Sequence, residues 1–222
     1  YPKDVEEVYF GENGIIANAK PGAVLIDMTT TSPKLSERIY AEAKPRGISA
    51  LDAPVSGGDS GAKAGTLSIM VGGDREAFDA CQDVFAAMGT NIIYEGGAGK
   101  GQHTKMANQI ALAGAVASVS EAIAYARRTG LDVETMLASI SKGAAGSWQM
   151  TNNAPKMVAG DMAPGFFIKH FIKDMAIADE EAKAAGLTMP VLEEVLEMYR
   201  KLDRRGEGDL GTQAVIHYFD EK

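Results

Sequence analysis

Short apolar runs alternate with helical patterns over the first half of the chain. Four runs have the length of a strand and are bounded by Gly, Pro, Asn, Thr or Asp, which favour turns. The first of them, AVLIDM, is typical of a buried strand in a parallel sheet. Between the runs, apolar residues recur at helical spacing, and one such segment begins with the N-cap Ser32 followed by Pro33. The strands are predicted at 23–28, 48–55, 66–73 and 91–96, and the helices at 32–47 and 74–89.

The second half of the chain carries helical patterns alone. The longest, 103–130, is rich in Ala, Gly and Ser, which let neighbouring helices approach closely, and it ends at Gly130 after two arginines. The chain is therefore predicted to contain an α/β part, 1–98, and an all-helical part, 99–222. Further helices are predicted at 132–143, 150–160, 170–186, 190–206 and 210–222.

Composition narrows the classes of function. The net charge of −8 and the pI of about 5.0 argue against a nucleic-acid surface or an anionic membrane as partner. Cys81 is the one cysteine, so the sequence allows no intramolecular disulfide and no Cys/His zinc set, and no other metal site is predicted. No uninterrupted apolar run approaches the roughly 18 residues that span a bilayer. We therefore expect a cytoplasmic protein without a membrane or nucleic-acid partner.

The stretch GAGKGQHTKMANQ opens the longest helix with glycines, a charge and an amide. Lys105 and Asn108 lie three residues apart, so both point from one face of a helix. Together they offer several donors to one oxygen, as a carbonyl that becomes an alkoxide requires. The alternative interpretation is a solvated lysine beside a surface amide. Gly99 and Gly101 do not form a dinucleotide fingerprint, because Thr104 takes the place of the third glycine.

A second polar stretch follows the predicted strand that ends at Val55. Ser56, Gly57 and Gly58 let the backbone curl so that several N–H groups converge, which forms a concavity for an anion. Ligands of open α/β sheets bind at the carboxyl ends of strands. A small carboxylate is therefore predicted to bind here, with an ordinary glycine turn as the alternative.

Polar side chains also occur at two further places where they could contact a ligand: after the first predicted strand and at the start of a predicted helix. The hydroxyls of 29–31, Thr30 among them, follow the first predicted strand directly, where the edge of a cofactor would lie. Lys173 and Asp174 occur in the apolar opening of a helix. The alternative interpretation of this pair is a partly exposed ion pair that binds no ligand.

Taken together, these stretches resemble the β-hydroxyacid dehydrogenases, which include 3-hydroxyisobutyrate dehydrogenase, tartronate semialdehyde (2-hydroxy-3-oxopropionate) reductase and glyoxylate/succinic semialdehyde reductases. DAPVSGG is similar to the family's substrate-binding motif, and GAGKGQHTKMANQ is similar to its catalytic G-x-G-x-x-x-K-x-x-N motif. GENGI, LIDMTT, GTLSIMVGG and FIKDMAIA match the intervening pattern in the same order. The resemblance implies an α/β Rossmann-like dinucleotide-binding domain, here N-terminally incomplete, followed by an all-α domain entered through a long interdomain helix.

The same resemblance implies hydride transfer between a small 3-hydroxy acid and its semialdehyde, with NAD or NADP as cofactor and Lys105 as general acid/base. It also implies a homodimer or homotetramer formed through the helical domain. By position in the motifs, the catalytic residues are Lys105 and Asn108, the substrate-binding residues are Ser56, Gly57, Gly58, Phe166 and Asp174, and the cofactor-binding residues are Thr30 and Lys173.

Three alternatives stay open. 6-Phosphogluconate dehydrogenase shares the lysine and the asparagine but has a much larger helical domain, and imine reductases share the fold but usually lack the lysine. A non-catalytic relative would bind a dinucleotide or a small acid, and Lys105 argues against it. The family's first strand, its G-x-G-x-x-G turn and the residue that selects NAD or NADP would come before Tyr1, so the preference for NAD or NADP is not predicted. The sequence does not identify the hydroxy acid either.

Overall fold

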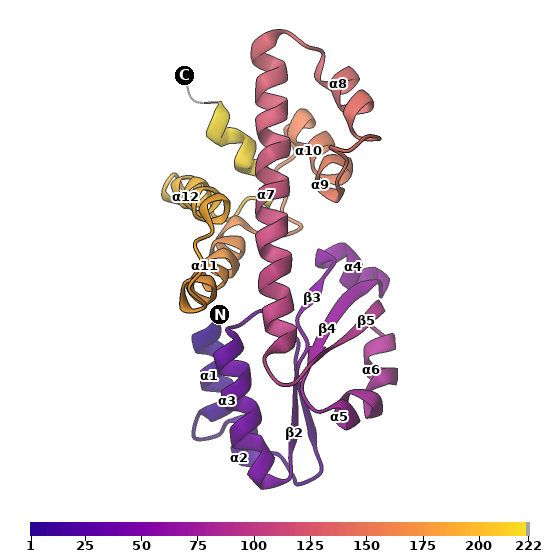
Figure 1. The fold of residues 1–222 in the computed structure, drawn as a ribbon, viewed down its shortest axis with the longest axis vertical. Helices are drawn as coiled ribbons and strands as arrows, with labels where there is room; N and C mark the ends of the chain where they lie inside the picture. The colour runs from indigo at the N-terminus through magenta and orange to yellow at the C-terminus, as the bar shows by residue number, and fades with distance from the viewer. Residues whose placement is uncertain (221–222) are drawn as a thin grey trace. The chain divides into compact units, whose positions relative to one another are not determined.

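The protein is described by a computed structural model that places residues 1–220 (Figure 1). The chain divides into two compact units, Tyr1–Ala107 and Asn108–Lys222. The division falls inside the long helix α7, Lys100–Thr129. The predicted boundary, between residues 98 and 99, lies just before this helix begins.

The first unit is built on a mixed sheet. Its strands are β1 Val24–Asp27, β2 Ser49–Asp52, β3 Val55–Ser56, β4 Leu67–Gly72 and β5 Gly89–Gly96. β1 and β2 pair in parallel, with Val24 opposite Ser49 and Asp27 opposite Asp52, as the first apolar run predicts. The run was also predicted to be buried, but Val24, Leu25 and Ile26 are only half-buried, because β1 lies at one end of the strand order. β4 is central, since it pairs antiparallel with β2 and β3 and parallel with β5.

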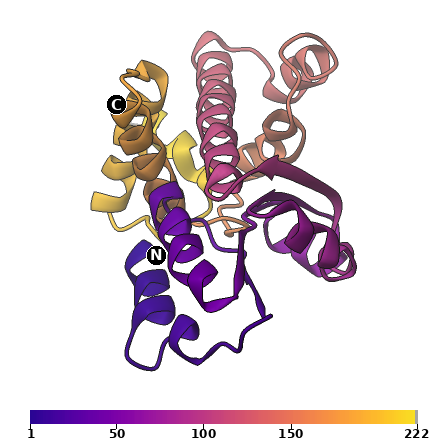
Figure 2. The same ribbon diagram turned by 60° about the horizontal axis from the view of Figure 1, so that its bottom comes forward.

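Helices cover both faces of this sheet. They are α1 Pro2–Phe10, α2 Ile15–Asn18, α3 Pro33–Ala43, η1 Lys44–Arg46, α4 Gly58–Ala64, α5 Arg75–Ala80 and α6 Gln82–Ala86. α1 and α3 lie on one face, and α5 and α6 lie on the other (Figures 1 and 2). Two apolar clusters follow from this layering. One, around Ile69 and Phe85, packs under α5 and α6, and the other, around Tyr9 and Ile39, packs under α1 and α3.

Neither α1 nor α2 was predicted, and the unit differs from the predicted elements at three further places. The predicted strand 48–55 is divided into β2 and β3, because Pro54 has no N–H to donate and the chain leaves β1 there while β4 pairs with both pieces. The predicted helix 74–89 is divided at Cys81, whose φ of −105° and ψ of 11° are not helical. α4 was not predicted, because it begins at Gly57 and Gly58, which have low helix propensity.

In the described residues, the second unit consists of packed helices, as predicted. The last two residues of the predicted helix 210–222 lie outside the described residues. Besides the greater part of α7, it contains α8 Val133–Ile140, α9 Trp148–Asn152, α10 Ala154–Ala159, α11 Ile168–Ala184, α12 Pro190–Arg204 and the 3-10 helix η2 Thr212–Phe219. Its core includes Val116 and Ile123 of α7, both fully buried. Phe171 of α11 meets Tyr199 of α12 edge to face, with ring centroids 5.1 Å apart. Tyr199 also donates through its hydroxyl to the main-chain oxygen of Thr212 at 2.6 Å.

α7 corrects one expectation from the sequence. Its length, and a mean hydropathy of 1.3 over an 18-residue window, are sufficient for a membrane span. A possible span was not predicted, because polar residues interrupt the apolar run, although the alanines and valines of the helix outweigh them in the mean hydropathy. Within the window, 44% of the residues are buried by the rest of the protein. A core helix of a soluble protein has the same features, so they are weak evidence for a span.

Candidate active site

Lys105 is a buried lysine in the second turn of α7. Lys105 as a whole is 7% exposed, and its Nζ donates to the main-chain oxygen of Val55 at 2.7 Å. A buried ammonium group is stable only when such partners surround it. The interpretation of Lys105 as a solvated lysine is therefore wrong. Its charged end lies against the first residue of β3, directly before Ser56.

The glycines before Lys105 allow the helix to begin against the sheet. A Cβ at Gly101 would lie 2.4 Å from the main-chain oxygen of Met70 and 2.5 Å from that of Asp52. No real side chain tolerates such contacts, so the first turn of α7 packs directly on β2 and β4 only with glycine there. Gly99 precedes the helix with a φ of 82°, a conformation that favours glycine. Close packing explains these residues without a bound phosphate.

Asp52 caps the same helix start. The N–H of Gly99 donates to its Oδ1 at 2.8 Å, and the N–H of Gln102 donates to its Oδ2 at 2.9 Å. A carboxylate at this end satisfies donors that have no partner inside the helix and complements the helix dipole. Burial raises the pKa of the Asp52 carboxyl, and the two amide hydrogen bonds oppose that shift. The sequence analysis missed Asp52, although an aspartate at the end of a strand was a visible signal.

The turn at Ser56, Gly57 and Gly58 joins β3 to α4. Gly57 and Gly58 have φ values of 136° and 62°, which residues with a side chain rarely adopt. A Cβ at Gly57 would also lie 3.0 Å from Cδ2 of Leu67. Both glycines are exposed. The turn is therefore accessible to a small anion, and it directly follows the carbonyl that Lys105 contacts.

The loop after β1 is held from inside the unit by Gln102. The Nε2 of Gln102 donates to the Thr29 oxygen at 2.8 Å, and the Thr31 N–H donates to its Oε1 at 3.1 Å. Thr29 is exposed and Thr30 is half-buried, so hydroxyl groups stay accessible on a loop whose main chain is fixed. Such a loop fits a ligand edge that both donates and accepts hydrogen bonds, as the carboxamide of a nicotinamide does.

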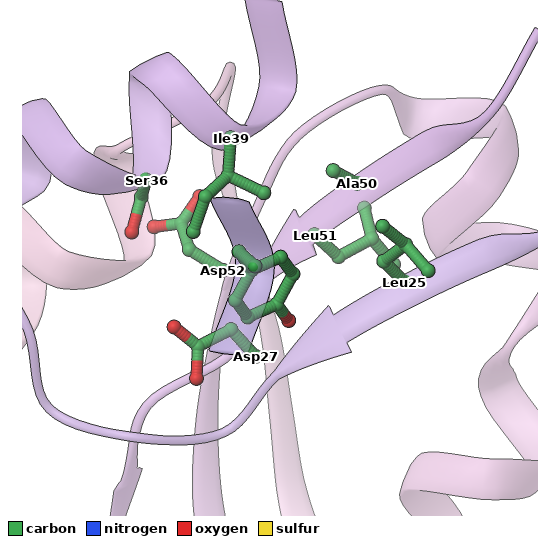
Figure 3. A pocket seen from close by; sticks show the side chains of 8 residues that line it. Leu25, Asp27, Ser36, Ile39, Ala50, Leu51 and Asp52 are labelled. Carbon is green, nitrogen blue, oxygen red and sulfur yellow. The ribbon is translucent and has the colours of Figure 1, made fainter. Parts of the chain in front are cut away.

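A small cavity lies between α3 and the sheet (Figure 3). Its polar wall is formed by Asp27 and Asp52, at the ends of neighbouring strands, and by Ser36 of α3. The cavity volume is about 10 Å³, which is room for about one water molecule. Ser36 Oγ is buried with no hydrogen-bond partner among the described residues, as expected if a water binds there. The cavity is too small for a substrate.

A chain of polar contacts runs through the second unit. Asn108 Nδ2 donates to Gln109 Oε1 at 2.8 Å, and Gln109 Nε2 donates to Asp174 Oδ2 at 2.6 Å. Lys173 Nζ lies 2.7 Å from Asp174 Oδ1. Lys173 and Asp174 form an ion pair in which the Asp174 side chain is 3% exposed and the Lys173 side chain is 17% exposed, so the carboxylate is buried and the lysine is half-buried. Gln109 was missed by the sequence analysis, because its partner lies on another helix.

Phe166 precedes α11 and is half-buried. Its ring packs against Phe171, with centroids 5.6 Å apart, and its main-chain oxygen accepts from the N–H of Thr212 at 3.0 Å. The structure thus fixes Phe166 at the beginning of the helix that carries Lys173 and Asp174.

A G-x-G-x-x-G spacing that the sequence analysis overlooked occurs at 206–211, between α12 and η2. The oxygens of Gly208 and Leu210 accept from the N–H groups of Lys169 and Ile168 at the start of α11, at 3.1 and 2.9 Å. The loop therefore turns carbonyl oxygens toward a helix and caps it, whereas a phosphate site needs converging N–H groups. Within residues 1–220, no strand-to-helix junction carries the fingerprint.

Comparisons with known proteins agree on one kind of relative. Residues 1–96 match the NAD binding domain of 6-phosphogluconate dehydrogenase, and residues 99–219 match the domain described as NAD-binding of NADP-dependent 3-hydroxyisobutyrate dehydrogenase. An uncharacterised oxidoreductase of Bacillus subtilis is 58% identical, with 97% of this chain and 75% of the relative covered. A probable mitochondrial 3-hydroxyisobutyrate dehydrogenase-like protein of Arabidopsis thaliana is 42% identical, with 97% and 65% covered.

A solved structure shows the same likeness in three dimensions. The 3-hydroxyisobutyrate dehydrogenase of Mycobacterium tuberculosis, determined with L-serine, superimposes with a TM-score of 0.86 at 32% identity. The match covers 93% of this chain and 73% of that one.

Proposed function

The chain belongs to the β-hydroxyacid dehydrogenase family of NAD(P)-dependent dehydrogenases, and on that basis we propose that it interconverts a small 3-hydroxy acid and its semialdehyde. The observation that carries the proposal is the buried Lys105, whose ammonium group contacts Val55, the residue directly before the Ser56 turn. The names of the relatives support the substrate class, since 3-hydroxyisobutyrate and L-serine are both acids with a hydroxyl on the third carbon.

The Ser56 turn is proposed to bind the substrate carboxylate. Positive φ angles at Gly57 and Gly58 aim main-chain N–H groups in directions that ordinary residues do not allow. An acid held there by its charged end would be fixed in orientation, which removes much of the entropy cost of bringing the reacting groups together. The proposal therefore favours short acids, in which the hydroxyl lies only two carbons from the carboxylate.

Lys105 is proposed to exchange the proton. When bound, the nicotinamide supplies the hydride for reduction of the aldehyde and accepts it in the reverse reaction. Lys105 would donate a proton to the carbonyl oxygen as the aldehyde becomes an alcohol, and would take that proton back during oxidation. Because Lys105 is buried, its charge would stabilise the developing alkoxide more strongly than a solvated lysine would.

The other predicted site residues are given proposed roles as cofactor or substrate contacts, separately for each unit. In the first unit, Thr30 is proposed to contact NAD or NADP on the loop that Gln102 holds. In the second unit, the contacts that join Asn108 to Gln109 and Gln109 to Asp174 support a shared role for polar side chains that lie far apart in sequence. The proposed roles there are Asn108 as the substrate-orienting residue, Lys173 as a cofactor contact, and Asp174 and Phe166 as substrate contacts.

The proposal is tested by oxidation of NADH and of NADPH by the full-length protein. We expect turnover with methylmalonate semialdehyde or tartronate semialdehyde, with kcat/KM on the order of 10⁴ M⁻¹s⁻¹ for the better of the two. Succinic semialdehyde and glyoxylate, whose alcohols are a 4-hydroxy and a 2-hydroxy acid, should react more slowly. Loss of the reduced nicotinamide absorbance gives the rate, and the corresponding hydroxy acid with the oxidised cofactor checks the reverse reaction. Binding of NAD(P)H without turnover of any aldehyde would favour the non-catalytic binding module.

We also infer a homodimer or homotetramer formed through the helical unit. α8 is apolar, with Val133, Met136 and Leu137 among its residues, yet none of its side chains is buried. Tyr125 and Trp148 are 67% and 63% exposed. A monomer would leave the apolar side chains of α8 half-exposed and Tyr125 and Trp148 largely exposed, whereas a second copy of the chain could cover them.

Sedimentation equilibrium should therefore give a mass of two or four chains. The double variant Leu137→Glu/Trp148→Glu should sediment with a mass nearer to one chain, because a charge would have to be buried in the interface. Val8→Glu places the same charge on an apolar residue of the first unit that is 53% exposed, and it should keep the native mass. A monomeric wild-type protein would contradict the inference.

A further inference from the structure

Gln102 joins segments of the first unit that lie far apart in sequence. The residue is fully buried. Its side-chain amide makes two hydrogen bonds to the main chain of one loop. Nε2 donates to the Thr29 oxygen at 2.8 Å, and Oε1 accepts from the Thr31 N–H at 3.1 Å. These are the residues on either side of Thr30. The side chain therefore holds the loop much as the main chain of a neighbouring strand would.

The backbone of Gln102 is fixed as firmly as its side chain. Its N–H donates to Asp52 at the end of β2, at 2.9 Å. The adjoining Gly101 brings the turn into contact with the main chain of Met70 in β4. A residue with a fixed backbone and a side chain that is hydrogen-bonded at both ends of its amide group has few alternative positions. The loop that carries Thr30 is therefore positioned by the start of α7.

Lys105 depends on the same support. It lies three residues after Gln102 in α7, on the same face of the helix, and it is also buried. Its ammonium contacts the oxygen of Val55 just beyond the end of β2. The helix turn thus determines both where the ammonium lies and where Thr30 lies, within one unit of the protein.

We propose that Gln102 is a positioning residue that sets Thr30, and the cofactor edge that Thr30 would contact, in alignment with Lys105. The proposal rests on the proposed function, in which Lys105 exchanges the proton. A misplacement of about 1 Å can lower a rate about 100-fold. Glutamine suits the place because the loop presents one acceptor and one donor, which a carboxylate or a thioether side chain cannot both satisfy.

The test compares the full-length wild-type protein with two variants. Gln102→Met keeps the length of the side chain and removes both loop hydrogen bonds, and Gln102→Glu keeps the acceptor for the Thr31 N–H. Hydrogen–deuterium exchange of a peptide covering 28–32 reports on the loop, fluorescence titration gives the NAD(P)H affinity, and steady-state kinetics give kcat and KM. If Gln102→Met does not fold, the same measurements on Gln102→Glu test the proposal.

For both variants we expect exchange in 28–32 to rise about tenfold or more, and NAD(P)H affinity to fall about tenfold. kcat should fall on the order of 30-fold, while KM for the semialdehyde changes less than about threefold. Tyr94→Phe is the control, since it deletes a half-buried hydrogen bond to the Gly73 oxygen, 3.0 Å long, in the same unit. It should lower stability without changing exchange in 28–32, affinity or kcat.

Two results would overturn the proposal. If exchange in 28–32 is unchanged, the hydrogen bonds of Gln102 do not hold the loop. If exchange rises but kcat stays within about twofold, the loop does not need to be held for catalysis. Failure of the proposed function is a separate result, because the wild-type protein would then turn over no aldehyde. In that case the exchange and affinity measurements still decide, since faster exchange with unchanged NAD(P)H affinity contradicts a positioning role for Gln102.

Discussion

Replacing Lys105 with methionine should lower kcat roughly 1000-fold, because the reaction would lose its proton donor and the charge that faces the developing alkoxide. Methionine fills nearly the same volume, and the residue is only 7% exposed, so packing should survive the change. The Val55 oxygen would lose a donor, which should cost about 1 kcal/mol of the free energy of unfolding. Steady-state kinetics measure the loss, and fluorescence titration should show that NAD(P)H still binds with an affinity within about threefold of the wild type.

The same change elsewhere on the helix provides the control. Lys100 is exposed in the first turn of α7, and Lys100→Met should leave kcat and KM as they are. If the Lys105 variant retained more than about a tenth of the wild-type kcat, another group would have to transfer the proton, and the role of Lys105 as general acid/base would be lost. Weakened cofactor binding would instead point to a disturbed fold.

Gly101→Ala should destabilise the first unit by about 3 kcal/mol or more. The added Cβ would lie 2.4 Å from the Met70 oxygen and 2.5 Å from the Asp52 oxygen, and both atoms belong to strand backbone that cannot rotate away. The first turn of α7 would have to lift from the sheet, which would stretch the hydrogen bonds to the Asp52 carboxylate. A drop in melting temperature of about 10 °C is expected by calorimetry, together with loss of activity.

A second glycine in the same helix should respond in the opposite direction. A Cβ at Gly114 meets only Cγ1 of Val191, at 3.7 Å, which is an ordinary contact. Gly114→Ala should therefore raise the free energy of unfolding by about 0.5–1 kcal/mol, since alanine has the higher helix propensity. Equal melting temperatures for Gly101→Ala and the wild type would show that α7 does not begin in close contact with the strands.

The features that the sequence predicted well depend on local patterns. The order of an α/β part and a helical part follows from the change in apolar periodicity near Gly101, and Ser32 and Pro33 begin α3 as predicted. The pattern failed where a single residue changed the backbone. Pro54 interrupts a run that reads as one strand, and Cys81 interrupts a run that reads as one helix. The cytoplasmic location and the oligomeric state stay predictions.

The candidate site was predicted in its residue types and only partly in its contacts. Lys105 and the Ser56 turn were named from their spacing, but the burial of Lys105 depends on the approach of α7 to the sheet. Gln102 and Gln109 were missed because each satisfies its amide with a partner distant in sequence, at Thr29 and at Asp174. A glutamine in a helix has no local pattern that distinguishes a tether from a surface residue.

The capped and tightly seated start of α7 makes the length of one short segment matter. One residue added or removed between Gly101 and Lys105 would turn every later position by about 100° around the helix axis. The helix could not shift or rotate to compensate, because its first N–H groups are hydrogen-bonded to the Asp52 carboxylate and Gly101 packs directly against the backbone of β2 and β4. Insertions and deletions among homologues of this protein should therefore be common in surface loops and rare between Gly101 and Lys105.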